Sequence, residues 1–495
     1  MQRRYAQHGY DGSAAEEEKP ADAKKVELPP PPVVTEHEIS IGRKKLSYFV
    51  TSGMMPYRNA EGEHEANFFH TAYTVGSATG DPDRPLTFCF NGGPGSSSVW
   101  LHLGGLGPKR VELEPEGWMP QPPYHLIDNE FTWLDKSDLV FIDPVGTGYS
   151  RANTPELVKK FHGVREDIES VGEIIRLYLV KNGRWTSPIY LSGESYGTTR
   201  AAGLAGYLVD RGVALNGILL ISMIFNYLTH EFHPGNDLPS VLFLPTYTAT
   251  AWYHKRLPAD LQAKPLREAL AEAEQWASTT YLLALLKGDA LQGEERAVIA
   301  RELARYSGLA EEVVERSNLR IQIHRFCKEL LRDQKRTVGR LDSRYTGIDA
   351  VAVTAEPDYD PSLAAIRPPF TSTINRYLRF DLGYENDDEY HILNRLDWSW
   401  GSSGEGYPNT SEGMRSAFSK NEHMKIYVAL GYYDLATPYF AARYTLDHLG
   451  LDPSQRDRIV TSDYEVGHMV YVHMDGLRTM KRDFDAFLED TLPRR

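Results

Sequence analysis

The stretch IYLSGESYG, residues 189–197, decides the fold of this chain of 495 residues. Its first three residues are apolar and typical of a buried β-strand, and a helical pattern begins at Thr198. Between the two, residues 193–197 fit the pattern G-x-S-x-G. In a tight strand-to-helix turn this pattern exposes a serine hydroxyl, and the glycines leave room for the turn. We interpret Ser195 as a nucleophile, because the strand before it and the helix after it argue against a chance match.

Short apolar runs of the buried-strand kind recur along the chain. They are residues 86–90, 139–142, 189–191, 218–221, 426–430 and 459–461, and helical patterns at 164–181 and 198–211 separate some of them. Buried strands that alternate with amphipathic helices predict a mainly parallel sheet with helices on both faces. Two partly alternating segments, residues 37–50 and 67–75, predict antiparallel edge strands.

The alternation of strands and helices breaks between residues 226 and 382. Residues 257–338 are rich in Ala, Glu, Leu and Arg with helical periodicity. We interpret residues 226–382 as a helical cap inserted into a catalytic domain of residues 35–225 and 383–495. Residues 1–34 are predicted to be disordered, because they are polar and proline-rich and hold few large hydrophobic side chains.

The composition excludes several classes of partner. A net charge of -14 argues against nucleic acid or an anionic membrane as the main partner, and the apolar runs are too short to span a bilayer. No signal peptide is visible, which predicts a cytoplasmic protein, or a periplasmic or secreted one if an export signal was removed. Two cysteines, Cys89 and Cys327, exclude a disulfide framework but leave a single bridge open. The sequence does not predict an oligomeric state.

A serine hydroxyl becomes a good nucleophile only when an oriented base takes its proton. In the α/β-hydrolase fold the order of these groups along the chain is Ser, then Asp or Glu, then His. Asp434 follows the predicted strand 426–430, and His468 follows the predicted strand near residue 459. Both lie just beyond strand ends, where an open α/β sheet assembles its site. The sequence therefore predicts an α/β-hydrolase with Ser195, Asp434 and His468 as its catalytic triad.

A glycine-rich loop, residues 91–95 (NGGPG), directly follows the predicted strand 86–90. This fold takes one oxyanion donor from such a loop and another from the residue after the nucleophile, which predicts the main chains of Gly93 and Tyr196. A phosphate-binding loop is the competing interpretation, but no Gly-Lys-Ser/Thr follows. His230 and His233 lack the spacing of a zinc motif, so we expect no metal and no cofactor.

Four blocks in register resemble the serine carboxypeptidase family. They are residues 91–95, 143–150 (DPVGTGYS), 193–197 and 467–469 (GHM), and residues 431–438 around Asp434 look most like the bacterial branch. The resemblance implies a serine-type carboxypeptidase that releases C-terminal residues from peptides through an acyl-enzyme. It also implies that Asn91 and a protonated Glu194 bind the terminal carboxylate, and that Met469 lines the pocket of the leaving residue.

Two departures from the family concern this carboxylate site. The family usually has a glutamate at the position of Gly105 and a tryptophan at the position of Cys89. Without the second carboxyl group, only desolvation would raise the pKa of Glu194, so we expect Glu194 to ionise at lower pH than in a paired site. The preference for a free terminal carboxylate should then be weaker and fall as the pH rises. The disulfides of eukaryotic members cannot form here.

Two other functions stay open at this point. An esterase or acyltransferase could use the same triad, because alcohols intercept an acyl-enzyme as water does. A non-catalytic binding protein of the same fold is a further alternative, although a dead scaffold has no need of all three triad residues.

Overall fold

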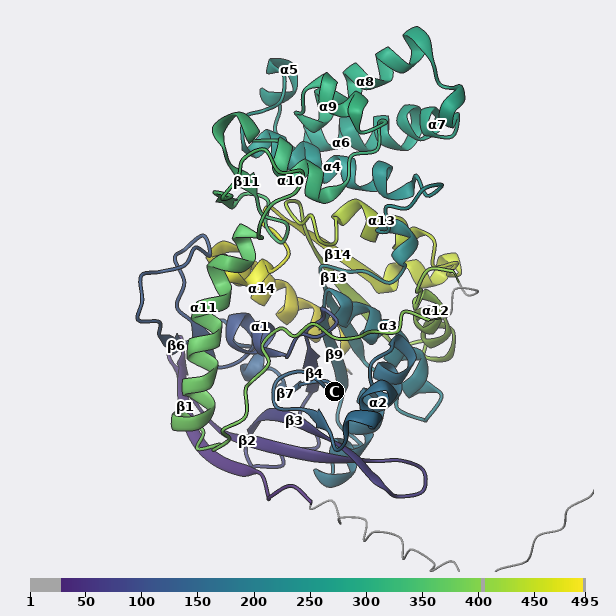
Figure 1. The fold of residues 1–495 in the computed structure, drawn as a ribbon. Helices are drawn as coiled ribbons and strands as arrows, with labels where there is room; N and C mark the ends of the chain where they lie inside the picture. The colour runs from purple at the N-terminus through teal and green to yellow at the C-terminus, as the bar shows by residue number, and fades with distance from the viewer. Residues whose placement is uncertain (1–27, 402–405, 493–495) are drawn as a thin grey trace, which may run out of the picture.

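A mixed sheet of ten strands crosses the lower half of the molecule in the computed structural model, which describes residues 28–401 and 406–492 (Figure 1). In sheet order its strands are β1 (Val33–Ile41), β2 (Lys44–Arg58), β3 (His64–Val75), β7 (Asp138–Ile142), β4 (Leu86–Phe90), β9 (Ile189–Glu194), β10 (Gly217–Ile221), β13 (Lys425–Gly431) and β14 (Ile459–Tyr464), and β8 (Arg151–Ala152) pairs with β3. The strands from β7 to β14 are mutually parallel. The predicted mainly parallel sheet is thus confirmed.

The N-terminal strands are antiparallel, as predicted, but only one of them is an edge. Residues 37–50 belong to a hairpin of β1 and β2, which turns at Gly42 with φ 59°. The prediction that residues 67–75 form an edge strand was wrong. β3 pairs with both β2 and β7 and is buried along most of its length, because it joins the antiparallel hairpin to the parallel strands.

Helices cover both faces of the sheet (Figure 1). One face carries α2 (Val164–Lys181), α3 (Tyr196–Val209), α12 (Ser411–Lys420) and α13 (Tyr439–Asp447), and the other carries α1 (Val99–Leu101), α11 (Pro361–Arg376) and α14 (Met474–Thr491). Each face of the sheet has its own hydrophobic core. Successive strand residues point to opposite faces, so Leu191 packs in the core beneath α2 and α3, and Tyr190 packs in the core beneath α11 and α14. Both cores are therefore built from the same strands.

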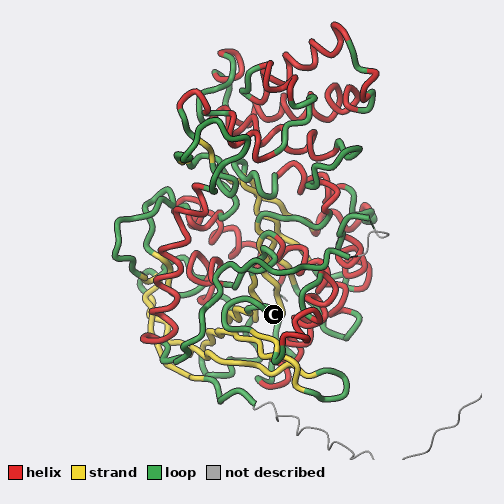
Figure 2. The backbone as a smooth tube through the Cα atoms, viewed as in Figure 1, coloured by secondary structure: helices red, strands yellow, loops and turns green. Residues whose placement is uncertain are grey.

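A third group of helices lies above the sheet and has a hydrophobic core of its own (Figures 1 and 2). These helices are α4 (Leu238–Tyr253), α5 (Ala259–Gln262), α6 (Leu266–Trp276), α7 (Leu282–Leu285), α8 (Gly293–Ser307), α9 (Glu311–Arg316) and α10 (Ile323–Glu329). We call residues 238–338 the cap; they end at β11 (Thr337–Val338), which pairs with β12 (Thr346–Gly347). Helix α11 belongs to the predicted insertion of residues 226–382, yet its Phe370 and Ile374 pack in the core of the sheet. The limits of the insertion stay a prediction.

Three further sequence expectations concern single features. Cys89 in β4 and Cys327 in α10 are both buried and free, so the bridge that the sequence left open is not formed. The segment predicted to be disordered, residues 1–34, lies outside the described residues as far as residue 27. Among the helices of the described ranges, none is both long enough and apolar enough to cross a membrane.

Candidate active site

Ser195 occupies a strained turn between β9 and α3, with φ 58° and ψ -130°. A positive φ is uncommon for a residue other than glycine and often marks a functional position. A Cβ added at Gly193 would lie 2.3 Å from the Gly197 carbonyl oxygen, and one at Gly197 would lie 2.7 Å from the Phe90 carbonyl oxygen. Both glycines of the pattern are therefore needed for close packing beneath the serine.

His468 and Asp434 are joined by a hydrogen bond of 2.8 Å between Nδ1 and Oδ2. Both side chains are buried at the ends of the strands that precede them, β14 and β13. Asp434 also accepts hydrogen bonds from the backbone N–H groups of Ala436 and Thr437 and from the Thr437 hydroxyl. An ionised carboxylate only accepts, so Nδ1 carries the proton and Nε2 is left for other chemistry.

In this pair, each side chain stabilises the charged form of the other. Burial acts to raise the pKa of Asp434, but His468 and the hydrogen bonds from Thr437 outweigh it, and that pKa is lowered. Burial acts to lower the pKa of His468, but the charge of Asp434 and its hydrogen bond outweigh it, and that pKa is raised. The arrangement therefore favours a carboxylate that orients the imidazole and stabilises it when it gains a proton.

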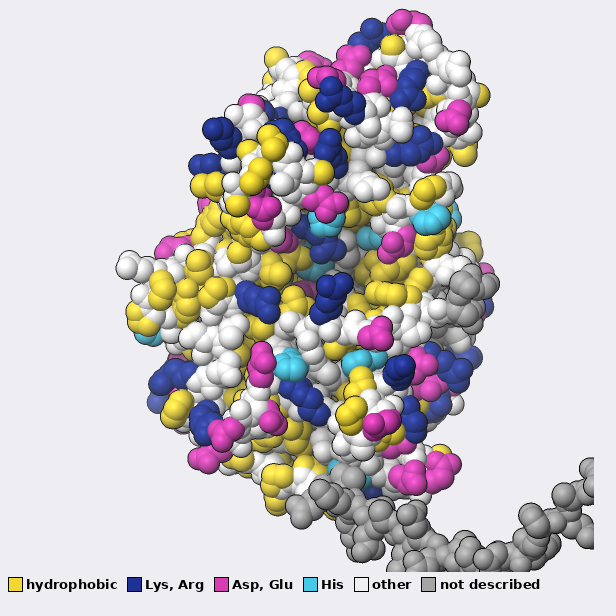
Figure 3. All heavy atoms as spheres, in the orientation of Figure 1, with side chains coloured by type: hydrophobic (Ala, Val, Ile, Leu, Met, Phe, Trp, Pro, Cys, Tyr) yellow, Lys and Arg dark blue, Asp and Glu magenta, His cyan; other side chains and the backbone are white. Residues whose placement is uncertain are grey.

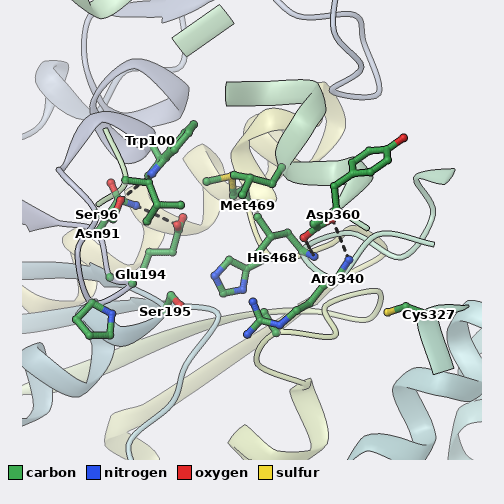
Figure 4. A pocket seen from close by; sticks show the side chains of 18 of the residues that line it. Asn91, Ser96, Trp100, Glu194, Ser195, Cys327, Arg340, Asp360, His468 and Met469 are labelled. Atoms are coloured by element: carbon green, nitrogen blue, oxygen red, sulfur yellow. Dashed lines mark hydrogen bonds between the residues drawn. The ribbon is translucent and has the colours of Figure 1, made fainter. Parts of the chain in front are cut away.

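Ser195 and His468 line one cavity of about 440 Å³ between the strand ends and the cap. Figure 3 shows the surface hollowed below the cap, and Figure 4 shows both side chains at the cavity wall. No hydrogen bond joins Ser195 to His468 within the described part of the chain. Such bonds are often long without substrate and tighten in the complex. The volume suits a small peptide end.

The loop of residues 91–95 packs directly against the start of α3. A Cβ added at Gly92 would lie 2.4 Å from the Tyr196 backbone nitrogen, and Gly93 has a φ of 105° and lines the cavity. The main chains of Gly93 and Tyr196, the predicted oxyanion donors, thus come from two segments in contact. The Tyr196 side chain is buried and donates a hydrogen bond to Asp167.

A buried ion pair holds these two segments together. Arg200 in α3 donates through Nε to Asp167 in α2 at 2.8 Å, and through a terminal nitrogen to the Asn91 carbonyl oxygen at 2.7 Å. Arg200 and Asp167 are each 1% exposed. Because Asp167 also accepts the Tyr196 hydroxyl, the pair fixes the glycine-rich loop relative to the nucleophile turn.

Asn91 and Glu194 form a buried polar pair at one end of the cavity (Figure 4). Asn91 donates through Nδ2 to Glu194 Oε1 at 3.0 Å, and its own Oδ1 accepts from the Leu101 backbone. Burial raises the pKa of Glu194 to about 7. The nearby His468 and Tyr471 act to lower this pKa, whereas Asp434 acts to raise it. The expectation that only desolvation would raise the pKa of Glu194 is therefore corrected, because Asp434 also acts to raise it.

Tyr471 was not predicted from the sequence, and it fills the space beside Gly105. A Cβ added at Gly105 would lie 2.6 Å from the Tyr471 Cβ, so a larger residue has no room there. The Tyr471 hydroxyl lies close to the Glu194 carboxyl and acts to lower its pKa. Both side chains are buried beside the site.

Met469 and Trp100 line the cavity beside this polar pair. Met469 was predicted from its place after His468, whereas Trp100 was not predicted. The Trp100 indole donates to Ser96 Oγ at 2.7 Å, which holds its ring at the wall (Figure 4). These two side chains give the polar end of the cavity an apolar rim.

Residues 340–343, which we call the strap, connect the end of the cap to both loops that carry the buried pair. The backbone N–H of His468 donates to Leu341, and that of Leu435 donates to Arg340. The Asp342 carboxylate accepts from the Gly467 backbone, and Ser343 donates to the Tyr433 carbonyl. The strap therefore holds the loop of Asp434 and the loop of His468 at a fixed spacing.

Comparison with known proteins supports a family assignment. Residues 45–264 match the model of the family described as serine carboxypeptidase, a stretch that contains Ser195 but not Asp434 or His468. A yeast relative, the pheromone-processing carboxypeptidase KEX1 of Saccharomyces cerevisiae, is 33% identical over 156 residues, 29% of this chain and 20% of the relative. The retinoid-inducible serine carboxypeptidase of Mus musculus is 29% identical over 145 residues, 28% of each chain. This chain therefore spans a fifth to just over a quarter of these relatives.

The fold has a counterpart among solved structures. The crystal structure of Kex1(delta)p, a prohormone-processing carboxypeptidase from Saccharomyces cerevisiae, matches with a TM-score of 0.53 at 18% identity. The match covers 89% of this chain and 91% of that chain. Together with the mostly parallel sheet and the helices on both faces, it identifies the α/β-hydrolase fold that the sequence predicted.

Proposed function

Since the chain belongs to the serine carboxypeptidase family through residues 45–264, we propose that it releases C-terminal residues from peptides through an acyl-enzyme. The observation that carries the proposal is the bond between His468 and Asp434 at the cavity that the strained Ser195 lines. A nucleophile, a base and an orienting carboxylate then share one site.

In this proposal Ser195 Oγ attacks the carbonyl carbon of the last peptide bond, and His468 Nε2 takes its proton. The backbone N–H groups of Gly93 and Tyr196 donate hydrogen bonds to the oxyanion that forms. The protonated imidazole, stabilised by Asp434, then donates its proton to the leaving amine, and the acyl group stays on Ser195. Water repeats the sequence and frees the enzyme.

The terminal carboxylate of the substrate binds at Asn91 and Glu194, and Met469 and Trp100 contact the leaving side chain. Glu194 is protonated below its pKa of about 7 and can donate a hydrogen bond to a carboxylate. Above that pH the ionised carboxyl repels the substrate. Free-acid peptides should thus lose their advantage over amidated peptides as the pH rises through 7, and Glu194→Gln should flatten that trend.

The test uses an N-blocked dipeptide with a free C-terminus and a fluorophosphonate probe. We expect release of the C-terminal amino acid and labelling by the probe, both lost in Ser195→Ala. Ser419→Ala, on an exposed position of α12, is the matched control and should behave as the wild type. Full peptidase activity in Ser195→Ala would overturn the mechanism. Turnover of esters without any turnover of peptides would favour an esterase instead.

A further inference from the structure

Arg340 brings a positive charge into the cavity from the strap. Its backbone is held on both sides, since its N–H donates to Asp360 Oδ1 at 3.1 Å and its carbonyl accepts from Leu435. Its guanidinium, in contrast, has no hydrogen bond or ion pair with any described residue. The Arg340 guanidinium is therefore available to bind an anion, because this planar group pairs well with carboxylates.

Asp360 accepts a hydrogen bond from the Arg340 backbone but forms none with the Arg340 guanidinium. The Asp360 carboxylate accepts from the backbone N–H groups of Arg340 and Leu341 and from the start of α11 at Ser362. Through these contacts the Asp360 carboxylate holds the N-terminus of α11 and the strap. The guanidinium is thus left for a group that enters the cavity with the substrate.

Arg340 and the carboxylate-binding pair lie on different sides of His468. In Figure 4, Asn91 and Glu194 lie at the left with Ser195 below them, Arg340 enters from the right, and His468 lies between. The guanidinium is close enough to His468 that its charge acts to lower the pKa of the imidazole. A peptide whose last carboxylate is at the left would extend its preceding residue to the right.

We propose that Arg340 binds an acidic side chain on the penultimate residue of the substrate, so that Glu or Asp is favoured there. This rests on the proposed function, which puts the terminal carboxylate at Asn91 and Glu194 and the attacked carbonyl at Ser195. Cys327, Val338 and Ala436 line the same cavity as Arg340 and add apolar groups to its wall. Apolar walls strengthen the attraction between the two charges, because they exclude water.

The test measures kcat/KM for N-blocked dipeptides that end in Leu and carry Glu, Gln or Lys before it. Glu and Gln have nearly the same shape, so their ratio isolates the charge. Hydrogen bonds to charged groups contribute enough that we expect a Glu preference of roughly tenfold or more in the wild type. In Arg340→Gln the ratio should fall close to one, and Arg340→Lys should keep part of it, since lysine has the charge without the planar fork.

Two controls make the ratio interpretable. Arg367→Gln makes the same change on an exposed position of α11 and should keep the wild-type ratio. Fluorophosphonate labelling of each variant reports whether the site is folded, independently of the peptide used. A variant that labels normally and loses only the Glu preference is the result expected.

The results that would overturn the role of Arg340 differ from those that would overturn the proposed carboxypeptidase function. A Glu-to-Gln ratio near or below one in the wild type overturns this inference, while turnover of the Gln peptide keeps the proposed function. An unchanged Glu preference in Arg340→Gln, with the advantage of free over amidated C-termini lost instead, also overturns it, because Arg340 would then bind the terminal carboxylate. Normal labelling without turnover of any peptide overturns both proposals.

Discussion

The proton on Glu194 should create a pH dependence of stability that Glu194→Gln removes. Glu194 is 2% exposed, and burial raises its pKa from 4.5 to about 7. In the unfolded chain this carboxyl is hydrated and ionises near its ordinary pKa. Between these two values the folded protein holds a proton that the unfolded chain has lost, so stability falls as the pH rises through this range. The loss is complete above the folded-state pKa and amounts to about 3 kcal/mol, from 1.36 kcal/mol per pKa unit.

The assay is urea unfolding of the wild type and of Glu194→Gln between pH 5 and pH 8. The difference in unfolding free energy should shift in favour of Glu194→Gln by about 3 kcal/mol as the pH rises over this range. Other titrating groups are present in both proteins, so most of their contribution cancels in the difference. Glu356→Gln, on an exposed loop, should show no such shift.

A second measurement detects the protonated carboxyl group of Glu194 directly. The infrared carbonyl band of a protonated, buried carboxyl should be present at pH 5, fade near pH 7 and be absent from Glu194→Gln. A free-energy difference that stays constant from pH 5 to pH 8, with no carboxyl band lost near pH 7, would refute the argument that burial keeps Glu194 neutral.

Three other variants test the surroundings of the site. Asp434→Asn should lower kcat by roughly 10⁴-fold with little change in KM, because the imidazole loses the acceptor at Nδ1; a drop under tenfold would contradict this role. Arg200→Met should lower the unfolding free energy by about 3–5 kcal/mol, since it leaves Asp167 buried without its partner, and Arg200→Met/Asp167→Asn should recover part of the loss in urea melts. Gly105→Ala should destabilise by about 1–3 kcal/mol, because its Cβ collides with Tyr471; an unchanged melting temperature would show that this ring moves freely.

The sequence predicted the parts of the site that local patterns encode. Ser195 was predicted because a strand, two glycines and a helix define its turn within nine residues. Asp434 and His468 were predicted because parallel strands end at the same edge of a sheet, so residues just beyond them meet. In the structure these two side chains are in hydrogen-bond contact.

The sequence did not predict residues whose place depends on packing between distant segments. Tyr471 meets Gly105 across more than 360 positions, and nothing around either residue indicates the contact. Arg340 reaches the cavity only because the strap is held by two loops nearly a hundred or more residues away. The strand β3 was taken for an edge because alternation in the sequence does not reveal that a second strand pairs on its far side.

The strap determines where a chimera with the cap of a relative should be joined. Its hydrogen bonds join it to the loops of Asp434 and His468, so residues 340–343 belong mechanically to the catalytic half although they follow the cap in sequence. A chimera that takes its cap from a relative should be joined before Arg340, because a junction beyond it would release both loops. Such a chimera would keep the guanidinium of its host. Exchange of the helices would then alter which peptides enter, while the preference for an acidic penultimate residue would stay with the catalytic half.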